Sequence, residues 1–85
     1  MPAAEFLLID NSNSFTKFAL SSRESIGPVR KLRTAALDAA SLRRILRGWR
    51  FARIVICSVV PEKCALISQN LAGLPLHAEI GRAHV

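Results

Sequence analysis

The chain has 85 residues, of which 51% are hydrophobic, and its twelve Lys and Arg against six Asp and Glu give a net charge of +6. This length excludes more than one small domain, and the hydrophobic content excludes a disordered chain. A basic balance is typical of proteins with a nucleic-acid, membrane or acidic partner. No aromatic residues alternate with the basic ones as a base-stacking platform requires, so we interpret the charge as a solvated face without a nucleic-acid partner.

The cysteines and the apolar runs indicate a cytoplasmic protein. Cys57 and Cys64 lie too far apart for a C-x-x-C motif, and we interpret them as reduced thiols rather than as a disulfide or metal ligands. Residues 54–60 are apolar, but this run is far shorter than the roughly 20 residues of a membrane span. Residues 1–5 lack the basic region of a signal peptide. We expect no membrane partner.

The first predicted elements are two strands joined as a hairpin. Residues 6–9 are continuously apolar and end in Asp10, which predicts a buried strand with a carboxylate at its carboxyl end. Residues 11–14 are turn formers. Residues 15–20 predict the second strand. Alternation along that strand places Phe15, Lys17 and Ala19 on one face and Thr16, Phe18 and Leu20 on the other.

A third strand and a helix follow. Residues 25–32 predict a weaker strand, with Pro28 at an edge or a bend. Asp38 is a good N-cap for a helix that runs to Arg47 and ends at Gly48. The apolar stripe of this helix predicts its core-facing residues, which are Leu42, Ile45, Leu46 and Trp49.

The remaining elements complete an alternating pattern. Residues 53–58 are rich in β-branched side chains and predict a buried central strand. Pro61 fits the first turn of a helix, Gly73 and Pro75 end it, and residues 76–78 begin another strand. The order β-β-β-α-β-α-β predicts an α/β fold, a mixed sheet covered by helices. In this arrangement we interpret Ser58 as a strand-end turn or helix-capping residue and His77 as a partly buried strand histidine.

The first predicted turn contains a group of residues that are suited to bind a phosphate group. The backbone N–H groups of a tight turn favour an anion, and Ser12, Ser14 and Thr16 add hydroxyl donors. Lys17 supplies a positive charge for a phosphate oxygen. Asp10 is suited to hold Mg²⁺ against the phosphates, directly or through water. The same residue types also make a plain hairpin turn that Asp10 caps, and this alternative stays open.

Residues 8–20 resemble the first phosphate motif of type III pantothenate kinases, D-x-G-N-T-x-x-K. Asp10, Asn13 and Lys17 match its spacing, and Ser14 replaces the Thr. Ser12 stands where the motif has Gly, a residue that permits positive φ and close approach of a phosphate. The stretch from Ile54 to Pro61 is similar to the family's apolar strand that ends in S-V-V-P.

The resemblance covers about residues 6–78 and implies the N-terminal part of an actin-like ATPase (ribonuclease H-like) domain, a fold shared by acetate and sugar kinases, Hsp70 and actin. It implies a homodimeric enzyme that phosphorylates pantothenate with ATP, the first step of coenzyme A biosynthesis. The implied cofactors are Mg²⁺ and a monovalent cation, K⁺ or NH₄⁺. Asp10 is the implied Mg²⁺ ligand, and the implied ATP-phosphate residues are Asp10, Asn11, Ser12, Asn13, Ser14, Phe15, Thr16 and Lys17.

The general base of the family lies in a G-x-D-R motif, which we expect beyond Ala78. Gly81 and Arg82 are not that motif, so the parent is expected to be a kinase while this chain by itself catalyses nothing. Residues 79–85 read like the in-frame translation of a common sequencing adapter. We therefore expect residues 1–78 to be a truncated N-terminal half-domain and residues 79–85 to be a non-native tail. The alternatives are a related non-enzymatic transcription accessory factor and another kinase or ATPase of the same superfamily.

Overall fold

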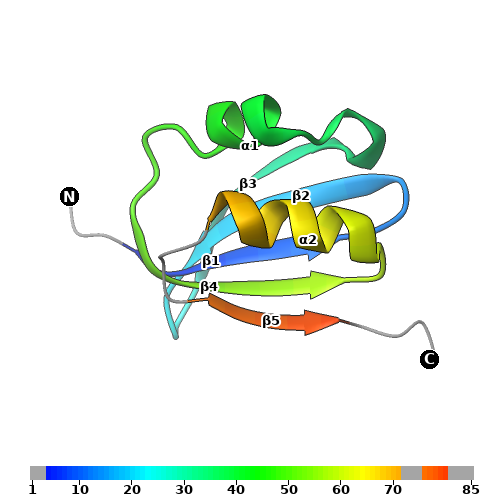
Figure 1. Ribbon diagram of the computed structural model, residues 1–85. Helices are drawn as coiled ribbons and strands as arrows, with labels where there is room; N and C mark the ends of the chain where they lie inside the picture. The colour runs from blue at the N-terminus through cyan, green and yellow to red at the C-terminus, as the bar shows by residue number, and fades with distance from the viewer. Residues whose placement is uncertain (1–3, 72–75, 81–85) are drawn as a thin grey trace.

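The computed structural model describes residues 4–71 and, as backbone, residues 76–80. Figure 1 shows the elements within these ranges, which are β1 (Ala4–Asn11), β2 (Phe15–Ser21), β3 (Ile26–Arg33), the 3-10 turn η1 (Thr34–Ala36), α1 (Ala39–Ile45), β4 (Phe51–Ser58), α2 (Pro61–Asn70) and β5 (Leu76–Ile80). The α/β prediction and its element order are confirmed. The arrangement is compatible with the N-terminal part of an actin-like ATPase domain.

The strands of the described residues form one mixed sheet in the order β3-β2-β1-β4-β5. β1 pairs with β2 and β2 with β3 in antiparallel fashion, while β4 runs parallel to β1 and to β5. Parallel strands end at the same edge of a sheet, so the carboxyl ends of β1 and β4 meet, with Asn11 opposite Ser58. The β1–β2 turn therefore lies beside the start of α2.

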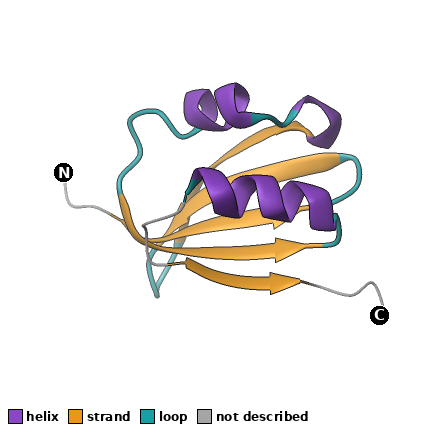
Figure 2. Ribbon diagram, viewed as in Figure 1, coloured by secondary structure: helices purple, strands orange, loops and turns teal. Residues whose placement is uncertain are grey.

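Both helices pack on one face of this sheet (Figure 2). The core between the layers consists of Leu7, Ile9, Phe18, Leu37, Leu42, Ile54, Ile56, Cys64 and Ile67, all at most 5% exposed. Because side chains alternate along a strand, β1, β2 and β4 contribute to this core from one face only. Burial of one such Leu, Ile or Phe side chain contributes about 1.5–3 kcal/mol.

The predicted helix boundaries are confirmed at the start of α1 and corrected at its end. Asp38 caps α1, since Ser41 N–H donates to Asp38 Oδ1 at 2.8 Å and Asp38 N–H donates to Ser41 Oγ at 2.9 Å. The helix ends at Ile45, two residues before the predicted Arg47, and Gly48 takes a left-handed φ of 82°.

Arg30 explains why α1 stops early. Its Nη1 donates to the carbonyls of Ile45 and Arg47, at 2.7 and 3.1 Å, and so satisfies groups that the helix itself leaves open. Its guanidinium lies 4.0 Å from the ring centroid of Trp49, a cation–π contact. Trp49 packs against the core as predicted, but with a cationic partner that the helical stripe did not reveal.

The other differences from the predicted elements concern strand ends. β4 begins at Phe51, two residues earlier than predicted, because Ala4 and Phe51 also pair. β5 continues to Ile80 and so includes the first two residues of the expected non-native tail. The helix breakers Gly73 and Pro75, the side chain of His77 and residues 81–85 lie outside the described residues.

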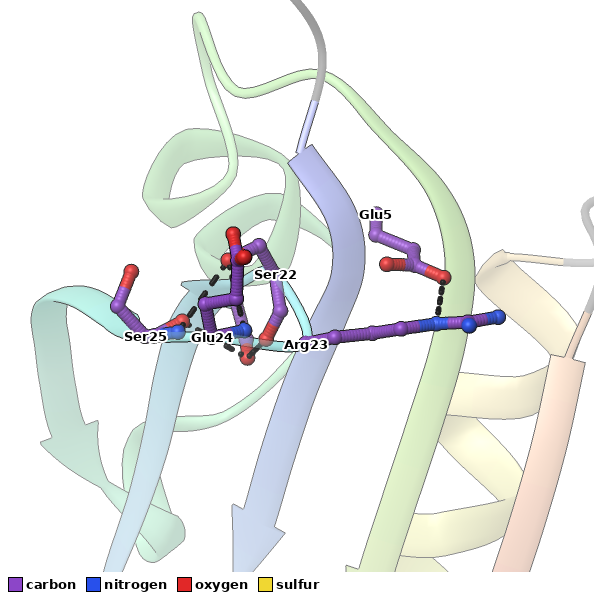
Figure 3. Close-up of polar contacts among 6 residues, drawn as sticks. Glu5, Ser22, Arg23, Glu24 and Ser25 are labelled. Atoms are coloured by element: carbon purple, nitrogen blue, oxygen red, sulfur yellow. Dashed lines mark hydrogen bonds and ion pairs between the residues drawn. The ribbon is translucent and has the colours of Figure 1, made fainter.

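The turn between β2 and β3 is closed by its own side chains (Figure 3). Ser22 N–H donates to the Ser25 carbonyl at 2.9 Å. Ser22 Oγ accepts hydrogen bonds from the N–H groups of Glu24 and Ser25 at 3.2 and 3.3 Å. The neighbouring Arg23 Nε lies 3.0 Å from Glu5 Oε2. The N–H groups of Ser22, Glu24 and Ser25 are thus satisfied within the turn.

Candidate functional site

The β1–β2 turn separates its residues onto the two faces of the sheet. Asp10 pairs directly with Lys17, and Asn11 pairs with Thr16. Alternation places Asp10 and Lys17 on the face away from the helices, where both are exposed, and Asn11 and Thr16 on the helix-covered face, where both are buried. The predicted division of the second strand into two faces is confirmed.

Asp10 and Lys17 line the rim of a hollow on this open face. The hollow has a volume of about 500 Å³ and is otherwise apolar, with Leu8, Ala19, Val29 and Val55 among its lining residues. Ser12 Oγ donates to Asp10 Oδ1 at 3.2 Å. Within residues 4–71 the one ion pair joins Arg23 to Glu5, so Asp10 and Lys17 do not pair with each other. The carboxylate and the ammonium group both remain available to a ligand.

A second cation lies beside Lys17. Lys31 is its cross-strand neighbour on β3, and Lys31 Nζ lies 4.8 Å from the ring centroid of Phe15. Phe15 is 38% exposed, so the phosphate-motif residue Phe15 supports a lysine rather than the core. The open side of the hairpin therefore carries two adjacent ammonium groups and one carboxylate.

On the covered face, four side chains form a buried polar chain, composed of Ser58, Asn11, Thr16 and Thr34. Each of the four is at most 4% exposed. Ser58 Oγ donates to Asn11 Oδ1 at 2.6 Å, and Asn11 Nδ2 donates to Thr16 Oγ1 at 2.8 Å. Thr16 Oγ1 lies 2.9 Å from Thr34 Oγ1, which donates to the Ser12 carbonyl at 2.6 Å. Every member is hydrogen-bonded, as buried polar groups must be to avoid a desolvation cost.

The direction of every bond in the buried polar chain is fixed. The single hydroxyl proton of Thr34 goes to the Ser12 carbonyl, which cannot donate, so the proton between the two threonines comes from Thr16. All donors therefore point toward the turn, and bonds in such a series strengthen one another.

This geometry corrects the expected role of two residues of the motif. The sequence analysis expected a Thr16 hydroxyl aimed at a phosphate and placed Asn11 among the phosphate contacts. Both side chains lie in the core, and their polar atoms are bonded within the protein. The reason is register: Asn11 and Thr16 continue the faces of Ile9 and Phe18, which the helices cover.

The turn backbone leaves donors open. Ser12 N–H donates to the Phe15 carbonyl at 3.1 Å, and Thr34 N–H donates to the Ser14 carbonyl at 2.9 Å. In contrast, the N–H groups of Asn13 and Ser14 donate to no residue in the described part of the chain. No non-glycine residue described has positive φ, so Ser12, in the place of a glycine, adopts its backbone conformation without strain.

A magnesium ion fits this turn only when phosphate oxygens of a bound nucleotide complete its coordination. Among the described residues, no group of three or more His, Cys, Asp or Glu side chains comes together. Mg²⁺ is commonly held by one or two carboxylates together with phosphate oxygens and water, and Asp10 supplies one such carboxylate. The donor set therefore suits a magnesium–phosphate complex rather than a bare ion.

Sequence reasoning did not single out Thr34. Its contacts reach Ser12 across 22 positions of the chain and Thr16 across 18. One signal was present: Asn11 and Ser58 end strands and Thr16 begins one, each on the buried face, and polar residues at such positions require partners.

None of the protein-family models matches the chain. The chain is 47% identical over 58 residues to a protein of Akkermansia muciniphila named type III pantothenate kinase, and the match covers 67% of this chain and 24% of that protein. The chain thus spans about a quarter of the length of that relative, and the similarity supports a relationship to the kinase over this segment. No helix in the described ranges is long and apolar enough to cross a membrane.

Proposed function

We propose that this chain is the phosphate-binding N-terminal segment of a kinase that transfers a phosphoryl group from ATP to pantothenate. The observation that carries the proposal is the β1–β2 hairpin, where Asp10 lies opposite Lys17 and the N–H groups of Asn13 and Ser14, in the adjoining turn, donate to no described residue. The partial similarity to a protein named type III pantothenate kinase supports the choice of acceptor.

Each group at the turn has a separate task. Lys17 neutralises charge on a phosphate oxygen, and the N–H groups of Asn13 and Ser14 hydrogen-bond to the same anion. Asp10 holds Mg²⁺, whose charge stabilises the transferring phosphoryl group. The monovalent cation, K⁺ or NH₄⁺, and the homodimer belong to this proposal through the family resemblance. Through the same resemblance we assign the catalytic base to the Asp of a G-x-D-R motif, and the residues of the β1–β2 hairpin supply phosphate binding.

A chimera tests the proposal. Residues 1–78 replace the corresponding segment of the Akkermansia relative, and pantothenate phosphorylation is measured with ATP and Mg²⁺. The chimera is expected to be active, and Asp10→Asn is expected to lower kcat about 100-fold or more, since it removes a charge that acts in the transition state. Lys17→Ala is expected to raise KM for ATP, whereas the matched change Lys31→Ala has a smaller effect. Unchanged turnover by Asp10→Asn would refute the assigned role.

The same chimera separates the proposed acceptor from others. The alternative is a different kinase of this superfamily, which would share the ATP site but phosphorylate another acceptor. Under that alternative we expect the 85-residue chain to bind ATP and the chimera to be inactive with pantothenate. The transcription-factor alternative predicts salt-dependent DNA binding and no response to ATP.

A further inference from the structure

We propose that Thr34 is a positioning residue for the phosphate turn, which it holds open by binding two of the turn's carbonyl groups. This inference rests on the proposed function, because it concerns how the same turn is kept ready for an anion. Thr34 opens η1, well outside the motif, and is 4% exposed. Its hydroxyl donates to the Ser12 carbonyl at 2.6 Å and its N–H to the Ser14 carbonyl at 2.9 Å.

The bond to Ser12 determines where the next N–H points. The described peptide bonds are all trans, so the carbonyl and the N–H of one peptide unit point in opposite directions. Thr34 draws the Ser12 carbonyl toward the helix-covered side, and the Asn13 N–H therefore points to the opposite side. That is the side on which Asp10, Ser12 and Lys17 lie.

Thr34 also replaces the bond that would normally close such a turn. Hairpins with two central residues prefer turn types in which one or both central residues have positive φ. No described non-glycine residue has positive φ. Among the described residues, Thr34 donates the hydrogen bond to the Ser12 carbonyl, and the Phe15 N–H does not donate to it. The turn is thus kept in its conformation by an external contact.

The buried polar chain strengthens this contact. Val60 N–H donates to Ser58 Oγ at 3.0 Å, and from Ser58 the donors run through Asn11, Thr16 and Thr34 to the Ser12 carbonyl. A carbonyl that accepts a strong hydrogen bond polarises its own peptide unit, which makes the N–H of that unit, here Asn13, a better donor. The turn is also ordered before an anion arrives, so binding does not have to supply that ordering.

The test uses the 85-residue chain and inorganic triphosphate as the probe, followed through the amide NMR signals of Asn13 and Ser14. Thr34→Val keeps the shape and the backbone N–H but removes the hydroxyl, and it is expected to weaken triphosphate binding about tenfold, the effect of one lost hydrogen bond. Thr34→Ser keeps the hydroxyl and is expected to bind within about twofold of the wild type. Ser41→Ala, which removes a hydroxyl of the α1 cap, controls for general loss of stability.

The outcomes separate this inference from the proposed function. A folded Thr34→Val chain that binds triphosphate like the wild type, or a Ser41→Ala chain that is weakened equally, overturns the positioning role. Absence of any triphosphate response in the wild type counts against the proposed function instead. In that case the ¹⁵N heteronuclear NOE of Asn13 and Ser14 decides: lower values in Thr34→Val than in the wild type support the constraint on the turn, and equal values overturn it.

Discussion

Two serine-rich turns lie at opposite ends of β2, and they differ in which of their backbone N–H groups are hydrogen-bonded. In the turn between β2 and β3, Ser22 Oγ accepts from two backbone N–H groups of the turn itself (Figure 3). In the turn between β1 and β2, the bonds fall on the carbonyls of Ser12 and Ser14, and their donor is Thr34. The first arrangement occupies the N–H groups of Ser22, Glu24 and Ser25, and the second leaves those of Asn13 and Ser14 open.

The difference shows that turns of similar composition can leave different backbone N–H groups open to a ligand. Ser, Asn and charged residues favour either turn. What matters is whether side chains accept from the turn's N–H groups, as Ser22 Oγ does, or leave those groups open. The following predictions test this contrast, beginning with the largest expected effect.

Asn11→Ala should cause the largest loss of stability. It removes both ends of an amide that joins Ser58 to Thr16 and leaves their buried polar groups without partners. We expect a loss of about 2–4 kcal/mol in the free energy of unfolding, measured by urea denaturation. The matched change Asn13→Ala, on an exposed turn side chain, should cost far less. Equal losses would mean that the buried polar chain does not support the turn.

Ser22→Ala should have a moderate effect that stays local. The N–H groups of Glu24 and Ser25 lose their acceptor but remain accessible to water, so we expect a loss of about 1 kcal/mol in thermal or urea unfolding. Ser25→Ala is the control, because its hydroxyl makes no hydrogen bond to the described residues. Triphosphate binding should not change in either variant, and a weaker affinity would show that the two turns are coupled.

Removal of the Asp38 cap should cause a smaller loss of stability, and the size of this loss should depend on pH. The Ser41 N–H donates to this carboxylate and, together with the nearby Ser41 side chain, holds the pKa of Asp38 below its ordinary value. A depressed folded-state pKa stabilises the protein above the unfolded value of about 3.9, and this stability is lost as pH falls through the folded-state pKa. Asp38→Ala should therefore lower the melting temperature at pH 7 but not at pH 2.

Asp38→Asn provides the control for that experiment. Asn is also a good N-cap, so it should keep most of the stability at pH 7 while losing its dependence on pH. The buried polar chain contains no titratable group, and so the effect of Asn11→Ala should be the same at both pH values. A strong pH dependence there would contradict the assigned contacts.

Arg23→Ala should have the smallest effect. Its ion pair with Glu5 spans 3.0 Å, but the Arg23 side chain is 79% exposed, and water screens such pairs. We expect a change within about 0.5 kcal/mol by urea denaturation. A larger loss would show that the Ser22–Ser25 turn also depends on a contact from outside it.

Much of the fold could be read from local patterns. The apolar run before Asp10, the alternation after Phe15 and the proline at the start of α2 each depend on neighbours in sequence, and each prediction is confirmed. The end of α1 was wrong because Arg30, 15 positions before Ile45, caps its carbonyls. Such a contact exists only after β3 and α1 have packed together.

The candidate site could be predicted only in part, because some of its contacts join residues that are far apart in the sequence. Alternation correctly separated Lys17 from Thr16, yet the motif alone assigned both to phosphate. Thr34 could not be found by spacing, because its contacts with the turn depend on the pairing of β2 with β3. A short motif thus identifies the residues of a turn but not a distant residue that holds the turn in shape.

The register of β4 against β1 has a practical consequence. Cys57 is the cross-strand partner of Asp10, is exposed and lines the same hollow, whereas Cys64 is buried in the core. A thiol-reactive fluorophore should therefore attach selectively at Cys57, one strand away from the proposed magnesium ligand. The chain thus carries a natural labelling position from which fluorescence can report whether the turn is occupied.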